Sequence, residues 1–466
     1  MMMLRPGKLL SLLVMAACLG ACATTSIFVP YPERARAYRQ AVVTGDFQSP
    51  LKDLDNRRDS ADKLLFLMER GRLEQLAGNT DASMTDYADA ISAYRASDDR
   101  AHISASHTIA LGAAMVSNDN SIPFEGAPYE RIFLHQFQAL NYVAKGDLEG
   151  ALVEVRRANS LQEQARNDHD QLVQDAKADA DKKSVTVDAS KYSSYFAPMD
   201  DAANRVKDSF QNAYTFYTSA LLYEAAGKLD DAYIDYKRAL EIYPDNPYVQ
   251  QDVLRLAQAL NRQQDVSALS TRVKLLPPAP PGSGAVVVLY EEGFAPAKQA
   301  VTVPIPWPYV WFTVSFPIYN DAWASGPPLR IQNGAQALSS SPIVDVQALA
   351  TRALKDNLYP MLVRQVLRAY AKHELQQQLE QQGGGLLGFI GMAYNIISEQ
   401  ADLRSWLTLP HSAQVSRLLL PAGQQALTLS TLTTQTTLTV PVSSGRITLV
   451  RVTNAGGRLY AASYPL

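Results

Sequence analysis

The chain has 466 residues, of which 47% are hydrophobic and 19% are charged. It is therefore long and apolar enough to bury the cores of two or three domains. Its formal net charge is −3, and no run of Lys or Arg exceeds a pair, which argues against nucleic acid as a partner.

Residues 1–21 have the pattern of a secretory signal peptide, with basic residues before the short apolar run Leu9–Leu19. That run is too short to span a bilayer. The next residues, Leu19-Gly20-Ala21-Cys22, resemble a bacterial lipobox, in which Cys22 is acylated and becomes the first mature residue. No other cysteine remains after cleavage, so Cys22 has no internal disulfide partner. The alternative is ordinary signal cleavage beside an incidental cysteine.

We therefore predict a lipid anchor, palmitate included, at Cys22, followed by a short tether over residues 22–32. The residue after Cys22 is Ala23, not an aspartate. By resemblance to Gram-negative lipoproteins, this implies sorting to the outer membrane, with the body of the protein in the periplasm.

Residues 33–265 are predicted to form a helical repeat domain. The clearest unit is Phe210–Pro247, where small and large residues are spaced around Gly227 as in a tetratricopeptide repeat (TPR). Two more units, Ala61–Tyr94 and Arg131–Leu161, carry turn glycines 68 residues apart, which is twice the repeat length of about 34. The sequence thus predicts stacked helical hairpins.

The remaining parts of this domain are less regular. Gly45 marks a degenerate first unit, and His102–Pro128 reads as a helix followed by a long loop. We expect the third unit to extend as a helix and to end in an exposed loop at Ser184–Met199. Apolar residues spaced by about 3.6 predict a capping helix at Tyr248–Arg262.

A proline-rich linker at residues 266–284 separates this domain from a predicted α+β domain at 285–466. The overall fold class is therefore mainly α, with a TPR-like solenoid followed by a smaller α+β domain that ends in an antiparallel sheet. Its expected elements are a strand at Ala285–Tyr290, edge strands at Val301–Ile318, a helix at Ile343–Gln381 broken near Pro360, and a small antiparallel sheet over Val415–Leu466. The apolar run Leu386–Ile397 is either core or a contact flap behind a glycine hinge.

Stacked repeats present a concave surface, so we expect a protein partner to bind there, although the repeats alone could also serve as a spacer. The candidate partner-binding residues are Tyr142, Arg156, Arg404 and Trp406. Arg404 and Trp406 lie in the stretch Ala401–Trp406, which is either a recognition strip or a structural helix end.

Catalytic and metal-binding patterns are missing from the sequence. It contains no GxSxG motif, and Gly383–Gly385 lacks the Lys-Ser/Thr ending of a phosphate loop. His102 and His107 are five residues apart, which is not the i, i+4 spacing of helical metal ligands, and His135 fits a packed histidine. We therefore expect no enzyme activity, no cofactor and no metal.

Several stretches together resemble a family of uncharacterised Gram-negative TPR-containing lipoproteins. They are the lipobox, Tyr129-Glu130-Arg131 with HQFQALNY, GDLEGALVEVRR at 146–157, VVVLYEEGFAPAK at 286–298 and ADLRSWLTLP at 401–410. Members of that family tend to be associated with lipoprotein activators of penicillin-binding proteins. The resemblance implies a role in cell-envelope or cell-wall assembly, without an assigned activity.

The sequence thus predicts a periplasm-facing outer-membrane lipoprotein that acts as a TPR interaction scaffold. Two other functions use the same features: a peptidoglycan-binding or cell-wall-modifying protein acting through the C-terminal domain, and a secretion-system assembly lipoprotein. The missing acid and nucleophile motif argues against a cell-wall enzyme, and paired carboxylates stay open as an alternative.

Overall fold

The computed structural model describes residues 29–104, 123–182, 188–273, 279–307, 310–368 and 400–466. The predicted lipidation site Cys22 and the apolar run Leu386–Ile397 lie outside these residues. Within the described residues, no helix is both long and apolar enough to cross a membrane.

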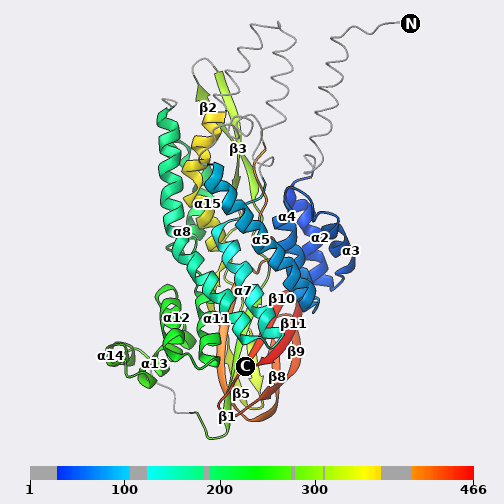
Figure 1. The fold of residues 1–466 in the computed structure, drawn as a ribbon, viewed down its shortest axis with the longest axis vertical. Coiled ribbons are helices and arrows are strands. Elements are labelled where there is room, and N and C mark those ends of the chain that lie inside the picture. Colours follow the sequence, from blue (N-terminus) through cyan, green and yellow to red (C-terminus); the bar gives the residue numbers. More distant parts are fainter. Residues whose placement is uncertain (1–28, 105–122, 183–187, 274–278, 308–309, 369–399) are drawn as a thin grey trace, which may run out of the picture.

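In the described residues, four helical hairpins precede the strands (Figure 1). They are α2 (Tyr31–Thr44) with α3 (Gln48–Asp55), α4 (Lys63–Leu76) with α5 (Thr80–Ser104), α7 (Pro128–Ala144) with α8 (Leu148–Lys182), and α11 (Ala213–Ala225) with α12 (Leu229–Ile242). The predicted capping helix is α13 (Pro247–Ala259), followed by the short α14 (Gln263–Ser270). The fold is therefore TPR-like, as predicted.

The turns of these hairpins follow from local sequence. Gly78 and Gly227 have φ values of +84° and +74°, a left-handed conformation that costs glycine little and other residues more. Each follows the first helix of its hairpin. The second helix can then fold back antiparallel to the first after only a few residues.

The linker between the third and fourth hairpins differs from the prediction. Residues 189–203 form short helical turns: η2 (Ala189–Tyr192), α9 (Ser193–Phe196), η3 (Ala197–Met199) and α10 (Asp200–Ala203). Phe196 and Met199 are buried in the main core, so the end of the expected loop at Ser184–Met199 is packed rather than exposed. The prediction was wrong there because it relied on the polar composition of the stretch. The packing is decided instead by the apolar side chains of Phe196 and Met199, which are buried.

Eleven strands follow in the described residues. They are β1 (Ser283–Glu292), β2 (Gln299–Trp307), β3 (Val310–Ile318), β4 (Arg330–Asn333), β5 (Gln336–Ser339), β6 (Ser341–Asp345), β7 (Ser412–Pro421), β8 (Gly423–Ser430), β9 (Gln435–Val442), β10 (Ile447–Ala455) and β11 (Arg458–Pro465). They form a five-stranded sheet of order β11-β10-β1-β7-β6, a four-stranded sheet of order β5-β4-β8-β9, and a separate β2-β3 hairpin.

Strand β1 lies at the centre of the larger sheet, antiparallel to β7 and parallel to β10. Its alternate residues face two cores: Val287 and Leu289 face the helices, whereas Val286 and Val288 face the smaller sheet. Burial on both faces explains why Ala285–Tyr290 is continuously apolar rather than alternating. The antiparallel sheets predicted at the C-terminus are present, but the last strands do not form a sheet by themselves, because they pair with β1 and β4.

The helix predicted from Ile343 begins three residues later, because Ile343–Asp345 belongs to strand β6, and its end beyond residue 368 lies outside the described residues. Helix α15 (Val346–Asp356) ends before Pro360, and a second helical stretch covers 358–368. The proline-containing β2 and β3 pair only with each other among the described strands, which agrees with their assignment as edge strands.

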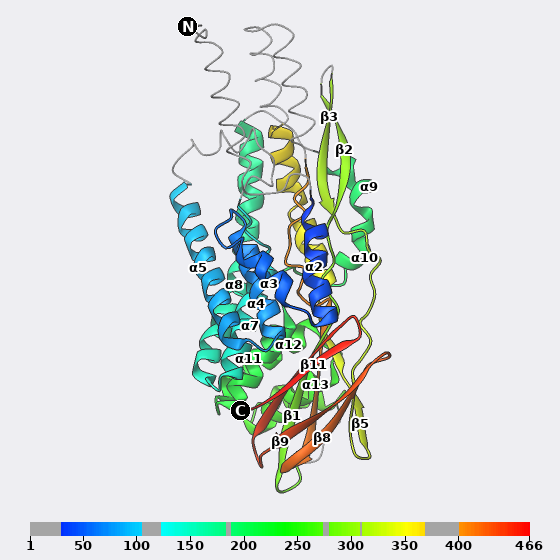
Figure 2. The same ribbon diagram turned by 90° about the vertical axis from the view of Figure 1, so that its right-hand side faces the viewer.

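The helices cover one face of the five-stranded sheet, and the four-stranded sheet packs on its other face (Figure 2). One apolar cluster runs through both halves of the chain, from Phe137 and Tyr217 of the helices to Val287 and Leu449 of the sheet. The proline-rich linker therefore separates the two parts in the sequence, but they share a hydrophobic core.

Candidate functional site

The inner face of the helical array is filled by the chain itself. Helices α4, α7, α11 and α13 each contact the five-stranded sheet or the extended stretch at 401–410. The clearest contact is around Glu291 of β1, which is fully buried. Its carboxylate pairs with Arg72 of α4 at 2.5 Å and accepts a hydrogen bond from the Tyr214 hydroxyl of α11 at 3.1 Å.

Glu291 carries its negative charge in this environment. Arg451 of β10 lies 3.5 Å from its second oxygen, and Thr453 donates a hydrogen bond at 3.0 Å. Burial by itself would raise the pKa of Glu291, but Arg72 and Arg451 lower that pKa to about 2. The group is therefore an ion-paired clamp between two helices and two strands.

A second clamp joins the last helices to β7. Glu224 of α11 binds Arg417 at 2.8 Å and Arg255 at 2.9 Å, and Asp252 of α13 lies 3.0 Å from Arg417. Burial opposes ionisation of Glu224, yet the two arginines lower its pKa to about 2. The fourth hairpin and the capping helix are thus attached to the sheet by charge as well as by apolar contact.

The stretch 401–410 crosses the inner face of α4 and α7. Trp406 is fully buried, and its ring contacts Tyr87 and Phe137 edge-on, at centroid distances of 6.0 and 5.7 Å. Two buried carboxylates hold the backbone: Glu130 accepts from the Trp406 N–H at 2.7 Å, and Glu69 accepts from the Leu407 N–H at 2.8 Å.

Arg404 is held within the chain as well. It is 4% exposed and forms ion pairs with Asp402, at 2.8 Å, and with Asp62. The structural interpretation of Ala401–Trp406 therefore describes these residues better than a recognition strip, although the stretch is extended rather than a helix end. The side chains of Arg404 and Trp406 are buried against the concave face of the helices, so they are not exposed there to a partner.

Tyr142 and Arg156 lie elsewhere: Tyr142 is in the last turn of α7, and Arg156 is on α8 beyond its first two turns. Tyr142 is half-buried, and a Cβ at Gly150 would lie 2.5 Å from its ring, so it closes the packing of the hairpin. Arg156 is exposed on α8. The four candidate partner-binding residues are not brought together.

His135 is buried between these two helices, as the sequence indicated for a packed histidine. Its Nδ1 lies 2.6 Å from the Glu154 carboxylate, and burial lowers its pKa despite this neighbour. Among the described residues, no group of three or more His, Cys, Asp or Glu is arranged to hold a metal ion.

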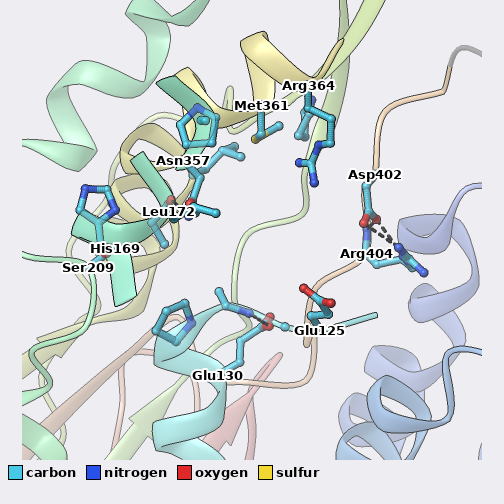
Figure 3. A pocket seen from close by; sticks show the side chains of 18 of the residues that line it. Glu125, Glu130, His169, Leu172, Ser209, Asn357, Met361, Arg364, Asp402 and Arg404 are labelled. Carbon is cyan, nitrogen blue, oxygen red and sulfur yellow. Dashed lines mark hydrogen bonds and ion pairs between the residues drawn. The ribbon is translucent and has the colours of Figure 1, made fainter. Parts of the chain in front are cut away.

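An open cavity of about 700 Å³ remains beside the third hairpin. Its walls come from residues 123–130 at the start of α7, the distal part of α8, residues 350–368 around and after α15, and Asp402 and Arg404. Figure 3 shows His169 and Leu172 on one side, Met361 and Arg364 above, and Asp402 and Arg404 on the opposite side. Such a volume is typical of ligand-binding cavities.

The cavity combines apolar walls with charged groups. Leu172 is 45% exposed, although it is a large apolar side chain in the middle of a polar helix. Glu125 and Arg364 are exposed at the rim, whereas Glu130 is buried at the base, where burial raises its pKa. This arrangement of described side chains can bind a group with both apolar and charged parts.

The sequence indicated only part of this cavity. Glu130 and Arg404 belong to stretches that carried the family resemblance. Leu172 lies on α8, whereas Met361 and Arg364 lie on the helical stretch at 358–368, and the sequence does not show that these two regions pack together. An apolar residue within the polar region Gln162–Val206 was the one available sign.

Comparisons with known proteins assign the chain to no family. No family model matches the chain, and no curated protein matches it. Among solved structures, the TPR2AB-domain:pHSP90 complex of yeast Sti1 matches with 11% identity and a TM-score of 0.20, covering 51% of this chain and 89% of that one. A tetratricopeptide repeat protein from Parabacteroides merdae matches with 12% identity and a TM-score of 0.14, covering 52% and 91%. Both similar structures are TPR proteins.

Proposed function

We propose that this protein is a lipoprotein attached through Cys22 to the periplasmic face of the outer membrane. In this proposal it acts as a non-enzymatic scaffold that holds a protein partner during cell-envelope or cell-wall assembly. The scaffold role is supported by the open cavity at the third hairpin, where the exposed Leu172 lies together with the charged rim residues Glu125 and Arg364.

The partner surface differs from that of a free TPR groove. The concave face is filled by β1, β10 and residues 401–410, with buried ion pairs that a peptide ligand would have to break. A partner therefore binds at the cavity, where apolar and charged side chains are unburied in the isolated chain. We expect a partner segment with one or more large apolar side chains next to charged ones.

Crosslinking in intact cells tests this proposal. A photoreactive amino acid at Leu172 should yield an adduct of defined mass with one periplasmic protein, because this residue lies in the cavity wall. The matched control is Ile234, which is also apolar and 49% exposed but lies on α12, away from the cavity. Equal adducts from both positions, or none from Leu172, would contradict the proposal.

The identity of the adduct distinguishes the related functions. A cell-wall synthase or its activator would support the cell-wall role, and a secretion-system component would support the assembly role instead. Adducts with peptidoglycan and with no protein would favour a glycan-binding protein.

The anchor requires a separate experiment. Cys22→Ala should remove the protein from the outer-membrane fraction, because several buried acyl chains give a long-lived attachment that the chain alone lacks. Fractionation of cells that express the variant and the wild type provides the measurement. Retention of the variant in the outer membrane would refute lipid anchoring.

A further inference from the structure

Strand β11 forms one edge of the five-stranded sheet, and this edge is accessible. Among the described strands it pairs with β10 alone. Every residue of β10 is buried, whereas Leu459–Tyr464 of β11 are all half-buried, although their side chains alternate between the two faces of the sheet. Figure 2 shows β11 at the front of the larger sheet. The partial exposure on both faces therefore comes from the open edge of the strand.

The register of the β10-β11 hairpin shows which backbone groups lie on this edge. The Leu466 N–H donates a hydrogen bond to the Ile447 carbonyl at 2.9 Å. Because hydrogen-bonded residues alternate along an antiparallel pair, the even-numbered residues of β11 bind β10 and the odd-numbered ones face outward. The outward N–H and C=O groups have no hydrogen-bond partner among the described residues; they belong to Leu459, Ala461 and Ser463.

Other edge strands of the two larger sheets are protected in ways that β11 lacks. Strand β6 contains Pro342, whose carbonyl accepts a hydrogen bond from the Asn246 side chain at 2.7 Å. The Tyr248 hydroxyl donates to a carbonyl of β5 at 2.6 Å, and β9 contains Pro441. Proline, charge and covering side chains are the usual means by which an edge avoids pairing with another strand. Leu459–Tyr464 contains neither proline nor a charged residue.

A second copy of β11 matches this edge in one antiparallel register. With Ala461 opposite its own counterpart, Leu459 lies opposite Ser463 of the partner subunit, and each outward residue can both donate and accept a hydrogen bond. A symmetry centre at residue 462 would instead place Leu459 opposite Pro465, which has no N–H to donate. The edge is therefore self-complementary about a two-fold axis at Ala461.

The side chains that face the helices agree with this register. Tyr460 would lie opposite Ala462 of the partner subunit, so a large side chain meets a small one. Arg458 would lie opposite the partner's Tyr464, and a guanidinium group interacts favourably with an aromatic ring. Self-pairing places no like charges opposite each other, because Leu459–Pro465 is uncharged.

We propose that β11 pairs antiparallel with β11 of a second copy of this chain, so that the two five-stranded sheets join across a two-fold axis at Ala461. A single strand edge buries less surface than a permanent dimer needs, so the association depends on concentration. This inference goes beyond the proposed function, and it requires neither the lipid anchor nor a partner at the cavity.

Disulfide formation between copies tests the pairing. In the full-length protein, Ala461→Cys should give a covalent dimer on a non-reducing gel after mild oxidation. The Cα atoms of a hydrogen-bonded pair lie about 5.5 Å apart, which is within the range of a disulfide. Ala337→Cys is the matched control, because Ala337 is an accessible alanine of the edge strand β5, and it should stay monomeric. The wild type measures the background from its native cysteines.

A pair of variants tests the register. Chains with Leu459→Cys and chains with Ser463→Cys should crosslink to each other when both are expressed together. Leu459→Cys alone should give little dimer, because its own counterpart is displaced along the partner strand. Efficient crosslinking of Leu459→Cys to itself would contradict the symmetry centre at Ala461.

Disruption of the edge provides an independent measurement. In sedimentation equilibrium of the detergent-solubilised protein, the mass of the wild type should approach twice that of the monomer as its concentration rises. Ala461→Pro should keep the protein monomeric without unfolding it, because an edge strand tolerates proline where the N–H faces outward. Ser463→Lys should weaken the dimer as well, and it leaves every backbone N–H in place. Circular dichroism of both variants confirms that they are folded.

The outcomes that overturn the inference are distinct from those that test the proposed function. No covalent dimer from Ala461→Cys, or equal dimers from Ala461→Cys and Ala337→Cys, would refute the pairing. A photoreactive amino acid at position 461 that labels only a different protein would show that an extended segment of that protein occupies the edge, and would also refute it. None of these results changes the crosslinking expected from Leu172 or the fractionation of Cys22→Ala.

Discussion

The filled concave face and the open cavity lie on the same helical array but differ in what covers them. On the concave face, Glu291 of β1 is ion-paired to Arg72 of α4, Glu224 of α11 is ion-paired to Arg417 of β7, and Trp406 occupies an aromatic pocket. At the cavity, Leu172 is partly exposed and Arg364 lies at the rim. The comparison shows that the concave face of a repeat array is not necessarily its binding surface. Here another part of the same chain already covers that face.

The buried carboxylates of the concave face also differ among themselves. Glu291 and Glu224 face arginines, which lower their pKa to about 2. Glu69 and Glu130 chiefly accept hydrogen bonds from the 406–408 backbone, and burial raises their pKa. The first pair therefore contributes stability through charge, whereas the second pair positions an extended segment.

Removal of the Glu291 carboxylate should have the largest effect. Glu291→Ala leaves Arg72 and Arg451 buried without their counter-charge, and we expect the free energy of unfolding to fall by about 3–5 kcal/mol. Unfolding in denaturant measures this free energy for the variant and the wild type. Glu163→Ala is the matched control: Glu163 pairs with Arg238 at the surface, so its loss should cost less than about 1 kcal/mol. Similar losses in both variants would mean that the clamp is not a buried one.

Acid should weaken the same clamp. The folded pKa of Glu291, about 2, lies below its ordinary value of 4.5, so the folded state binds fewer protons and stability rises with pH. This contribution is present above about pH 4.5, is lost as the pH falls toward 2, and is worth roughly 3 kcal/mol. Unfolding free energies at pH 6 and pH 3 provide the measurement. Glu291→Gln should have a flatter acid limb, and an unchanged slope would contradict the assignment.

A smaller loss is expected at Gly71 of α4. A Cβ at this position would lie 2.4 Å from the ring of Tyr87 on α5, so Gly71→Ala should push the helices of the second hairpin apart. We expect a cost of about 1–3 kcal/mol in unfolding free energy, as for other overpacked cores. Ser92→Ala, on the exposed side of α5, should change stability little. Equal unfolding free energies for the two variants would contradict this prediction, because they would mean that the Tyr87 ring moves aside without a loss of stability.

The smallest effect on stability is expected at the cavity. Leu172→Asp should change the unfolding free energy by no more than about 0.5 kcal/mol, because the side chain is 45% exposed. In the proposed function, the same substitution abolishes partner crosslinking from other cavity positions such as Met361. Thermal unfolding and crosslinking of one preparation measure both quantities. Loss of stability together with crosslinking would place Leu172 in the core instead.

Local features of this protein could be read from its sequence. The hairpin turns at Gly78 and Gly227, the alternation along β8 and β9, and the break before Pro360 depend on residues within a few positions of each other, and the structure confirms them. The alternation expected farther along, at Ile447–Val452, is absent, because β10 is buried on both faces. The end of the linker at Ser184–Met199 could not be predicted, because Phe196 and Met199 are buried against residues far away in the chain.

By itself, the sequence determined that helical hairpins precede a β-rich part, because backbone periodicity and turn chemistry are local. Only the tertiary structure decided that β1 lies between β7 and β10, that Trp406 occupies the concave face, and that a cavity stays open at the third hairpin. These features rest on contacts between residues that are hundreds of positions apart, such as Arg72 with Glu291. Such contacts depend on shape and charge complementarity between whole surfaces, which no local pattern encodes.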